Sequence, residues 1–144
     1  MNPNVISQQH CVLAIDDDFG FLDLLKAALG REGYTVLTAS TRQEAIRLYE
    51  ARWREIDIVL LDYLLYPVFG DFVFDELQRL NPDVRIVLVT GYDKSVAAEM
   101  FQKGLRGYLQ KPFSLPDLGR TVKAAISTPP ASSAALPSPV CRDN

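Results

Sequence analysis

Three short runs of the chain are apolar at every position, and this continuity constrains the fold more than any other feature. Residues 11–15 read Cys-Val-Leu-Ala-Ile, residues 58–61 read Ile-Val-Leu-Leu and residues 86–89 read Ile-Val-Leu-Val. A strand that faces solvent on one side alternates apolar and polar residues, whereas a strand covered on both sides is apolar throughout. The runs therefore predict buried strands of a parallel sheet with helices packed on both faces.

Helical patterns separate the predicted strands. Strands are expected at 11–15, 35–39, 58–61, 86–89 and around Tyr108, and helices after Asp18, after Thr41, over 70–80, over 95–103 and after Ser114. The helices are identified by apolar residues at spacings of three and four. On this basis Tyr49 and Trp53 are expected on the buried face of the second helix, and Leu77 and Leu80 on that of the third. Alternation of strand and helix is typical of an α/β fold.

Composition and length suggest one domain. The chain has 144 residues, which we divide into a flexible leader (1–10), a folded domain (11–127) and a disordered tail rich in Pro, Ala and Ser (128–144). A net charge of −3 argues against general binding of nucleic acid. No apolar stretch approaches the roughly 20 residues needed to span a membrane. Because Cys11 and Cys141 make no disulfide framework and no signal peptide is visible, we expect a cytoplasmic protein.

Side chains suited to ligand binding follow four of the predicted strands. Asp16 and Asp17 follow the first strand, Asp62 the third, Thr90 the fourth and Lys111 the fifth. Ligands of open α/β sheets bind outside the carboxyl ends of the strands. Carboxylates gathered there repel one another unless a cation joins them, and Mg²⁺ prefers oxygen ligands. The pattern therefore predicts a magnesium site at this edge of the sheet.

Each of these residues also has an ordinary structural interpretation. The acidic residues 16–18 could form a helix N-terminus, where negative charge is favourable, and we interpret Asp18 in that way. Thr90 could be a strand-forming residue, Lys111 a solvated lysine and Tyr108 a half-buried strand aromatic. Asp62, after the third strand, is harder to explain structurally, because a negative charge near other carboxylates is unfavourable unless it serves a function.

In their order, the motifs resemble those of the response-regulator receiver domain, the CheY-like phosphoacceptor of two-component signalling. The matching motifs are Ile-Asp-Asp-Asp at 15–18, Leu-Leu-Asp at 60–62, Val-Thr-Gly at 89–91 and Tyr-Leu-Gln-Lys-Pro-Phe at 108–113. The resemblance covers residues 11–127. It implies a flavodoxin-like (βα)5 three-layer sandwich with a parallel five-stranded sheet in the order 2-1-3-4-5.

The resemblance also implies chemical roles for single residues. Asp62 would be the phosphoacceptor, because a carboxylate can attack phosphorus to give an acyl phosphate. The implied Mg²⁺ ligands are Asp16 (directly or through water), Asp17, Asp62 and the backbone carbonyl of Leu64. Thr90 would hydrogen-bond a phosphoryl oxygen, and Lys111 would act on the developing charge. Tyr108 would be the switch aromatic that turns inward when Thr90 moves, and the Lys111–Pro112 peptide bond would be cis.

The partners that the resemblance implies are proteins. A histidine kinase or a phosphotransfer protein would supply the phosphoryl group, and the rim residue Phe19 is expected to touch it. A downstream protein, not identified by the sequence, would bind the face formed by residues 95–127, since we expect no output domain after the receiver. The chain would be a monomer or a weak dimer, with self-catalysed phosphorylation and dephosphorylation as its only reactions. Residues 107–113 are similar to receivers of hybrid histidine kinases, so a free-standing regulator and a relay intermediate both stay open.

The segment after the expected phosphoacceptor departs from the family pattern. Tyr66 stands where the family usually has proline, Pro67 follows it, and the stretch 63–69 is apolar enough to suggest an exposed docking surface. In the receiver family, the positions two residues after the phosphoacceptor and after the strand-end threonine influence how easily water attacks the phosphoryl group. Here these positions hold Leu64 and Tyr92, which are large and carry no charge to orient a water molecule. We therefore predict slow self-dephosphorylation.

Parts of the sequence also fit two other functions. The residues 16–18 superficially match the Asp-x-Asp motif of haloacid-dehalogenase-type phosphatases, but Gly20 replaces the usual Thr or Val and no acidic pair follows Lys111. A receiver-like module that binds a protein independently of phosphorylation is the other alternative. The complete set of acidic residues, threonine and lysine argues against it.

Overall fold

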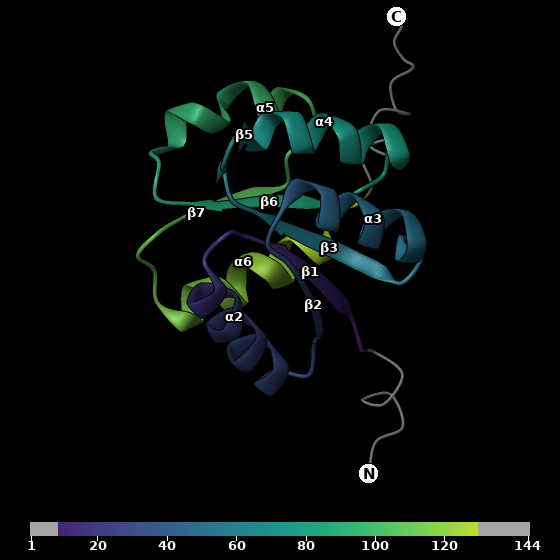
Figure 1. The fold of residues 1–144 in the computed structure, drawn as a ribbon. Helices are drawn as coiled ribbons and strands as arrows, with labels where there is room; N and C mark the ends of the chain where they lie inside the picture. Colours follow the sequence, from purple (N-terminus) through teal and green to yellow (C-terminus); the bar gives the residue numbers. More distant parts are fainter. Residues whose placement is uncertain (1–8, 130–144) are drawn as a thin grey trace, which may run out of the picture.

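The apolar runs form a parallel five-stranded sheet in the computed structural model, which describes residues 9–129. The strands are β1 (Cys11–Ile15), β2 (Thr35–Ala39), β3 (Ile56–Leu61), β6 (Ile86–Thr90) and β7 (Gly107–Gln110). They lie in the order β2-β1-β3-β6-β7, which is 2-1-3-4-5 when only these five strands are counted (Figure 1). The predicted fold is confirmed. The expected leader and tail fall almost wholly outside the described residues.

Five α-helices complete the three layers. One face of the sheet carries α2 (Phe19–Arg31) and α6 (Leu115–Ser127), and the other carries α3 (Arg42–Arg52), α4 (Gly70–Leu80) and α5 (Ala98–Gln102) (Figure 1). The helix expected over 95–103 is divided, because the 3₁₀ turn η1 (Lys94–Ala97) precedes α5. Within residues 9–129, no helix is both long and apolar enough to cross a membrane.

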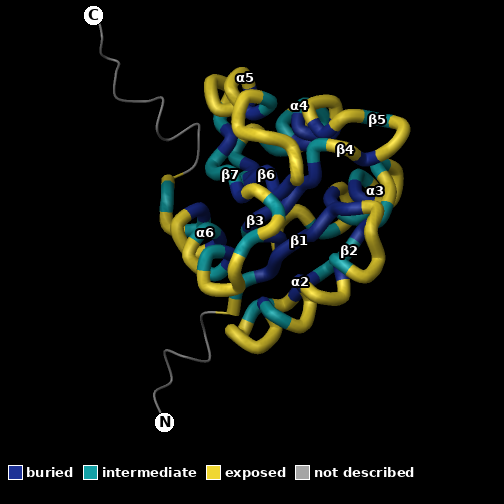
Figure 2. The backbone as a smooth tube through the Cα atoms, turned by 90° about the vertical axis from the view of Figure 1, so that its left-hand side faces the viewer, coloured by how far each residue is buried: buried dark blue, intermediate teal, exposed yellow. Residues whose placement is uncertain are grey.

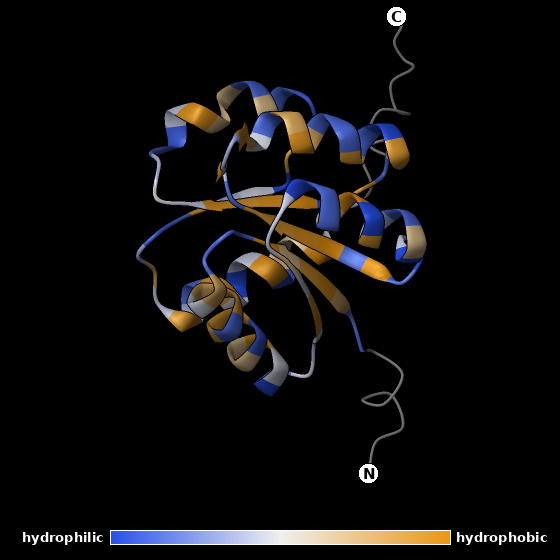
Figure 3. Cartoon of the chain, viewed as in Figure 1, coloured by the Kyte–Doolittle hydropathy of each residue, from blue (hydrophilic) through white to orange (hydrophobic). Residues whose placement is uncertain are grey.

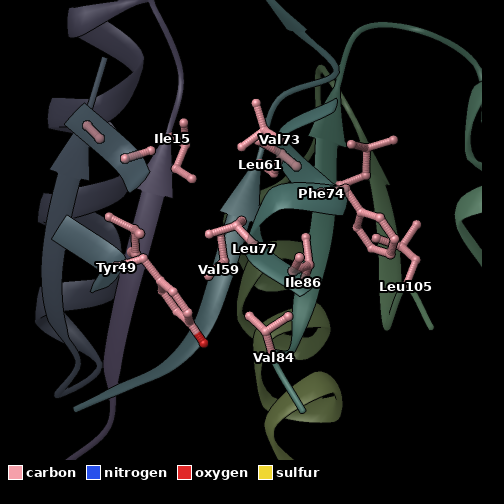
Figure 4. Close-up of a cluster of buried hydrophobic side chains, with 14 of the residues drawn as sticks. Ile15, Tyr49, Val59, Leu61, Val73, Phe74, Leu77, Val84, Ile86 and Leu105 are labelled. Carbon is pink, nitrogen blue, oxygen red and sulfur yellow. The ribbon is translucent and has the colours of Figure 1, made fainter. Parts of the chain in front are cut away.

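Both faces of the sheet are buried, which explains the uninterrupted apolar runs. Val59 and Leu61 of β3 pack in the core with α3, α4 and α5 (Figure 4), whereas Ile58 and Leu60 pack with α2 and α6. The ring of Tyr49 is fully buried, and its hydroxyl accepts a hydrogen bond from Asn81 at 3.0 Å. Figure 2 shows the buried strands inside a shell of exposed helix surface, and Figure 3 shows the matching hydropathy of the strands.

Two of the predicted core residues lie at the surface instead. Trp53 and Leu80 are each 39% exposed. Trp53 is the C-cap of α3 and Leu80 is the last residue of α4, so both lie where their helices leave the sheet. Phe74 is buried on α4 and fills the core there. Helical periodicity correctly identified the buried face of each helix. It was wrong at the helix ends, where the same face is no longer covered by the sheet.

A short hairpin between β3 and α4 was not predicted. It consists of β4 (Leu64–Leu65) and β5 (Val68–Phe69), which pair antiparallel. The Tyr66–Pro67 bond in its turn is cis, as is the Lys111–Pro112 bond. The hairpin carries much of the apolar stretch 63–69, and Tyr66 and Phe69 are 80% and 48% exposed. This exposure is required by the docking-surface hypothesis, which stays a prediction.

Candidate functional site

Three carboxylates meet at the carboxyl edge of the sheet. Ile15 and Leu61, the last residues of β1 and β3, are register partners, so the acidic residues that follow them are neighbours. One oxygen from each of Asp16, Asp17 and Asp62 lies within 4.8 Å of the other two. Asp16 is 2% exposed and Asp62 8% exposed, whereas Asp17 is exposed. The edge therefore gathers oxygen ligands of the kind that Mg²⁺ prefers.

Lys111 supplies the positive charge next to these carboxylates. Its Nζ lies 2.7 Å from Asp16 Oδ2 and 3.6 Å from Asp62 Oδ2. The ammonium also lies 4.1 Å from the centre of the Phe21 ring, in cation–π geometry. The backbone N–H of Lys111 donates to the Thr90 carbonyl at 2.8 Å, which fixes the start of the segment after β7. Lys111 is thus a paired lysine and not a freely solvated one.

Thr90 and Tyr108 lie on the neighbouring strands β6 and β7. Thr90 ends β6, is 1% exposed, and its Oγ1 accepts a hydrogen bond from the Tyr92 N–H at 3.4 Å. Tyr108 is half-buried on β7, and its hydroxyl donates to the backbone carbonyl of Tyr92. Both residues expected to form the switch therefore contact the same loop residue.

An open cleft of about 270 Å³ gives access to the carboxylates. The cleft is lined by Asp17, Asp62, Leu64, Thr90, Gly91 and Tyr92. The side chains of Leu64 and Tyr92 are 37% and 42% exposed at its rim. Phe19, at the start of α2, is 70% exposed and therefore available for the contact with a phosphodonor protein that we predict.

The electrostatics of the cleft favour a bound cation. Burial raises the pKa of Asp62, and the charge of Asp16 raises it further. Lys111, the Thr90 hydroxyl and the Leu64 amide act in the opposite direction, but the net shift is upward. One ammonium thus compensates the crowded carboxylates only in part. A divalent cation would remove the remaining repulsion, so the residues present fit Mg²⁺.

The structure brings together the three carboxylates, Thr90 and Lys111 that the sequence assigned to the site, and Tyr108 contacts the cleft residue Tyr92. Leu64 lies at the cleft, and its N–H is 3.4 Å from Asp62 Oδ1, while the use of its carbonyl as a ligand stays a prediction. The interpretation of Asp18 as a helix-start residue agrees with its hydrogen bond from the Phe21 N–H at 3.1 Å. Sequence reasoning missed the role of Phe21 beneath Lys111 and the ring of Tyr63 beside the cleft. A helical spacing marks Phe21 only as a core residue.

Comparison with known proteins identifies the family. The model of the response regulator receiver domain matches residues 12–123. The chain belongs to this family. Receiver domains are signalling domains and not classical enzymes, so the match places this chain in two-component signalling and apart from the phosphatases considered above.

Individual relatives agree with this assignment. The receiver is 33% identical over 122 residues to the sensor kinase CckA of Brucella abortus (strain 2308), covering 84% of this chain and 13% of that protein. It is 30% identical over 117 residues to the transcriptional regulatory protein ZraR of Escherichia coli O157:H7, covering 81% and 26%. The chain therefore spans about a quarter or less of these curated relatives.

A solved structure shows the same fold. A response regulator receiver domain protein from Clostridium thermocellum superposes with a TM-score of 0.77 at 30% sequence identity. The superposition covers 81% of this chain and 94% of that chain.

Proposed function

We propose that Asp62 accepts a phosphoryl group from a histidine kinase or a phosphotransfer protein, and that this modification switches the binding of a downstream protein. The observation that carries the proposal is the convergence of three carboxylates with Lys111, beside a cleft that Asp17, Asp62 and Thr90 line. A site with this composition suits phosphoryl transfer, in which positioning and charge neutralisation supply most of the catalysis.

The reaction would proceed at the carboxylate of Asp62. One of its oxygens attacks the phosphorus of a phosphohistidine, the phosphorus–nitrogen bond breaks, and the imidazole takes the electron pair and then a proton. Asp16, Asp17, Asp62 and the Leu64 carbonyl would hold Mg²⁺. When bound, Mg²⁺ would neutralise charge on the transferring group. Lys111 Nζ, 3.6 Å from Asp62, is near enough to act on the same charge.

The output would follow from a change in hydrogen bonding next to the cleft. A phosphoryl oxygen on Asp62 would attract the Thr90 hydroxyl, which now accepts from the Tyr92 N–H. Movement of Tyr92 would release the hydroxyl of Tyr108, which now donates to the Tyr92 carbonyl. Tyr108 could then turn inward and alter the surface of residues 95–127. A local change in charge would in this way bias a two-state element.

The direct test is intact mass after incubation with Mg²⁺ and acetyl phosphate. We expect a gain of one phosphoryl group in the wild type and none in Asp62→Asn. Asp23→Asn, a change of the same chemistry on the exposed side of α2, is the matched control and should be phosphorylated normally. A folded wild type that gains no phosphoryl group from acetyl phosphate or from a phosphotransfer protein would contradict the proposal and favour a phosphorylation-independent binding module.

A further inference from the structure

The side chain directly after the proposed phosphoacceptor lies between two other aromatic rings. The half-buried ring of Tyr63 has its centre 5.4 Å from that of Phe69 and 5.3 Å from that of Tyr92. The planes are inclined by 33° and 67°, and both separations lie within the usual range for attractive aromatic pairs. Tyr63 also packs against the core on the side of α3 and α4. Its ring therefore connects the hairpin to the loop after β6.

Of these two neighbours, Tyr92 lines the acceptor cleft and Phe69 pairs with a residue that lines it. Phe69 is the register partner of Leu64 in the hairpin, and Leu64 lines the cleft. Tyr92 lines the cleft from the loop after β6. The ring of Tyr63 thus contacts one lining residue, Tyr92, directly and is connected to another, Leu64, through its strand partner Phe69.

The backbone around Tyr63 is held in place on both sides. The Asp62 N–H donates to the Ile15 carbonyl at 3.1 Å, and the Gly70 N–H donates to the Tyr63 carbonyl. The main chain next to Tyr63 is therefore tied to the end of β1 and to the start of α4. From this anchored backbone the ring packs against Phe69 and Tyr92.

We propose that Tyr63 is a positioning residue that keeps Leu64 and Tyr92 over Asp62 and so slows hydrolysis of the phosphorylated form. This inference rests on the proposed function. In hydrolysis, the oxygen of a water molecule attacks phosphorus, the bond between phosphorus and the Asp62 oxygen breaks, the carboxylate is regenerated, and phosphate leaves while the water gives up a proton. Two large uncharged side chains at the rim restrict the approach of that water molecule. Without the Tyr63 ring, both would move more freely.

The lifetime of the phosphorylated protein tests the proposal. The protein is phosphorylated with acetyl phosphate and Mg²⁺, the donor is removed, and the decay is followed by intact mass. We expect Tyr63→Ala to shorten the lifetime about 3- to 10-fold, and Tyr63→Phe, which keeps the ring, to stay within about twofold of the wild type. Tyr34→Ala is the matched control, because Tyr34 is also half-buried but packs against the opposite core. It should leave the lifetime unchanged.

A double-mutant cycle separates positioning from simple loss of stability. If Tyr63 acts through Tyr92, adding Tyr63→Ala to Tyr92→Ala should change the lifetime by much less than Tyr63→Ala alone, since coupled residues are non-additive. Three results would overturn the proposal: a wild-type lifetime in Tyr63→Ala, an equal loss in Tyr63→Phe, or effects of Tyr63 and Tyr92 that multiply. If Tyr63→Ala does not fold, Tyr63→Leu keeps most of the buried volume without the aromatic contacts.

A measurement on the unphosphorylated protein distinguishes this proposal from the function on which it rests. Three-bond scalar couplings, which report side-chain rotamers independently of ring currents, should change at Leu64 and Tyr92 in Tyr63→Leu but not in Tyr34→Leu. Unchanged couplings would overturn the positioning role even if Asp62 is phosphorylated. Changed couplings in a protein that no donor phosphorylates would keep the placement by Tyr63 and reject the proposed function.

Discussion

The ammonium of Lys111 lies closer to Asp16 than to Asp62, at 2.7 Å against 3.6 Å. Asp16 is almost completely buried, and its carboxylate is held by this ion pair and by the Asp18 N–H, which donates to Asp16 Oδ1 at 3.0 Å. Removal of one partner from a buried pair leaves an uncompensated charge, which is more costly than the net contribution of the pair. Lys111 therefore has a structural task in the metal-free protein besides any task in phosphoryl transfer.

Substitution of this lysine should destabilise the metal-free protein. We expect Lys111→Met to lower the free energy of unfolding by about 3 kcal/mol in urea at pH 7 with a chelator present. Mg²⁺ should restore part of the loss, because the metal would compensate the same carboxylates. The control is Lys103→Met, which removes the exposed ion pair with Asp75 and should change stability by less than about 1 kcal/mol. Equal losses in the two variants would show that Asp16 does not depend on Lys111.

Substitution of Asp62 should have the opposite effect on stability and raise the free energy of unfolding of the metal-free protein. Burial and the Asp16 charge raise its pKa in the folded state, so the folded protein favours the protonated form. Its contribution to stability is present below the unfolded-state pKa and is lost as pH rises through the raised folded-state pKa. At pH 7 without metal, Asp62→Asn should therefore stabilise the protein by about 1–2 kcal/mol.

The stability of Asp62→Asn relative to the wild type, measured against pH and Mg²⁺, tests this prediction. The advantage of Asp62→Asn over the wild type should shrink as pH falls through the raised pKa, measured by urea unfolding between pH 7 and pH 4. Mg²⁺ should stabilise the wild type more than the variant. A variant that is less stable than the wild type at pH 7 in chelator would mean that Asp62 is well compensated in the folded state.

The sequence was sufficient to predict the sheet and the residues gathered at its edge. Strands such as β3 are buried on both faces, so their apolar runs are unbroken, and chain order with parallel pairing then brings Asp16, Asp62 and Lys111 to one edge. The predictions failed where tertiary contact decides the outcome. Periodicity could not show that Trp53 and Leu80 lie beyond the covered parts of their helices.

The sequence also could not predict the hairpin or its aromatic contacts. Strands of two residues, such as β4 and β5, carry no periodicity that could identify them. The packing of Tyr63 between Phe69 and Tyr92 joins residues from three segments, so no local pattern predicts it. The close approach of Gly70 to the backbone of Asp62 and Tyr63, which constrains this loop, is visible only in three dimensions.

The thiol of Cys11 should be nearly unreactive in the folded protein. Cys11 is 8% exposed at the start of β1, and burial is the main cause of its raised pKa. Since the thiolate is the reactive form, both effects slow modification. In a Cys141→Ser background, a colorimetric disulfide reagent at pH 8 should react at least about 100-fold more slowly with folded protein than with protein in 8 M urea, measured from absorbance. Rapid modification without denaturant would contradict the burial of this strand.

Gly70 and Gly30 should respond in opposite directions to the same substitution. A Cβ on Gly70 would lie 2.7 Å from the Asp62 carbonyl oxygen and 2.8 Å from the Tyr63 Cα, both backbone atoms that cannot turn aside. Gly70→Ala must therefore displace the backbone of the proposed phosphoacceptor or the start of α4. We expect a loss of about 1–3 kcal/mol in the free energy of unfolding, together with slower phosphorylation by acetyl phosphate.

Gly30 lies in α2 with nothing within 4 Å of the added carbon. Because alanine is the better helix former, Gly30→Ala should stabilise the protein by up to about 1 kcal/mol and leave phosphorylation unchanged. Urea unfolding and intact mass after incubation with acetyl phosphate are measured on both variants. If Gly70→Ala is as stable and as readily phosphorylated as the wild type, the acceptor strand can move away from α4 without loss of stability or phosphorylation.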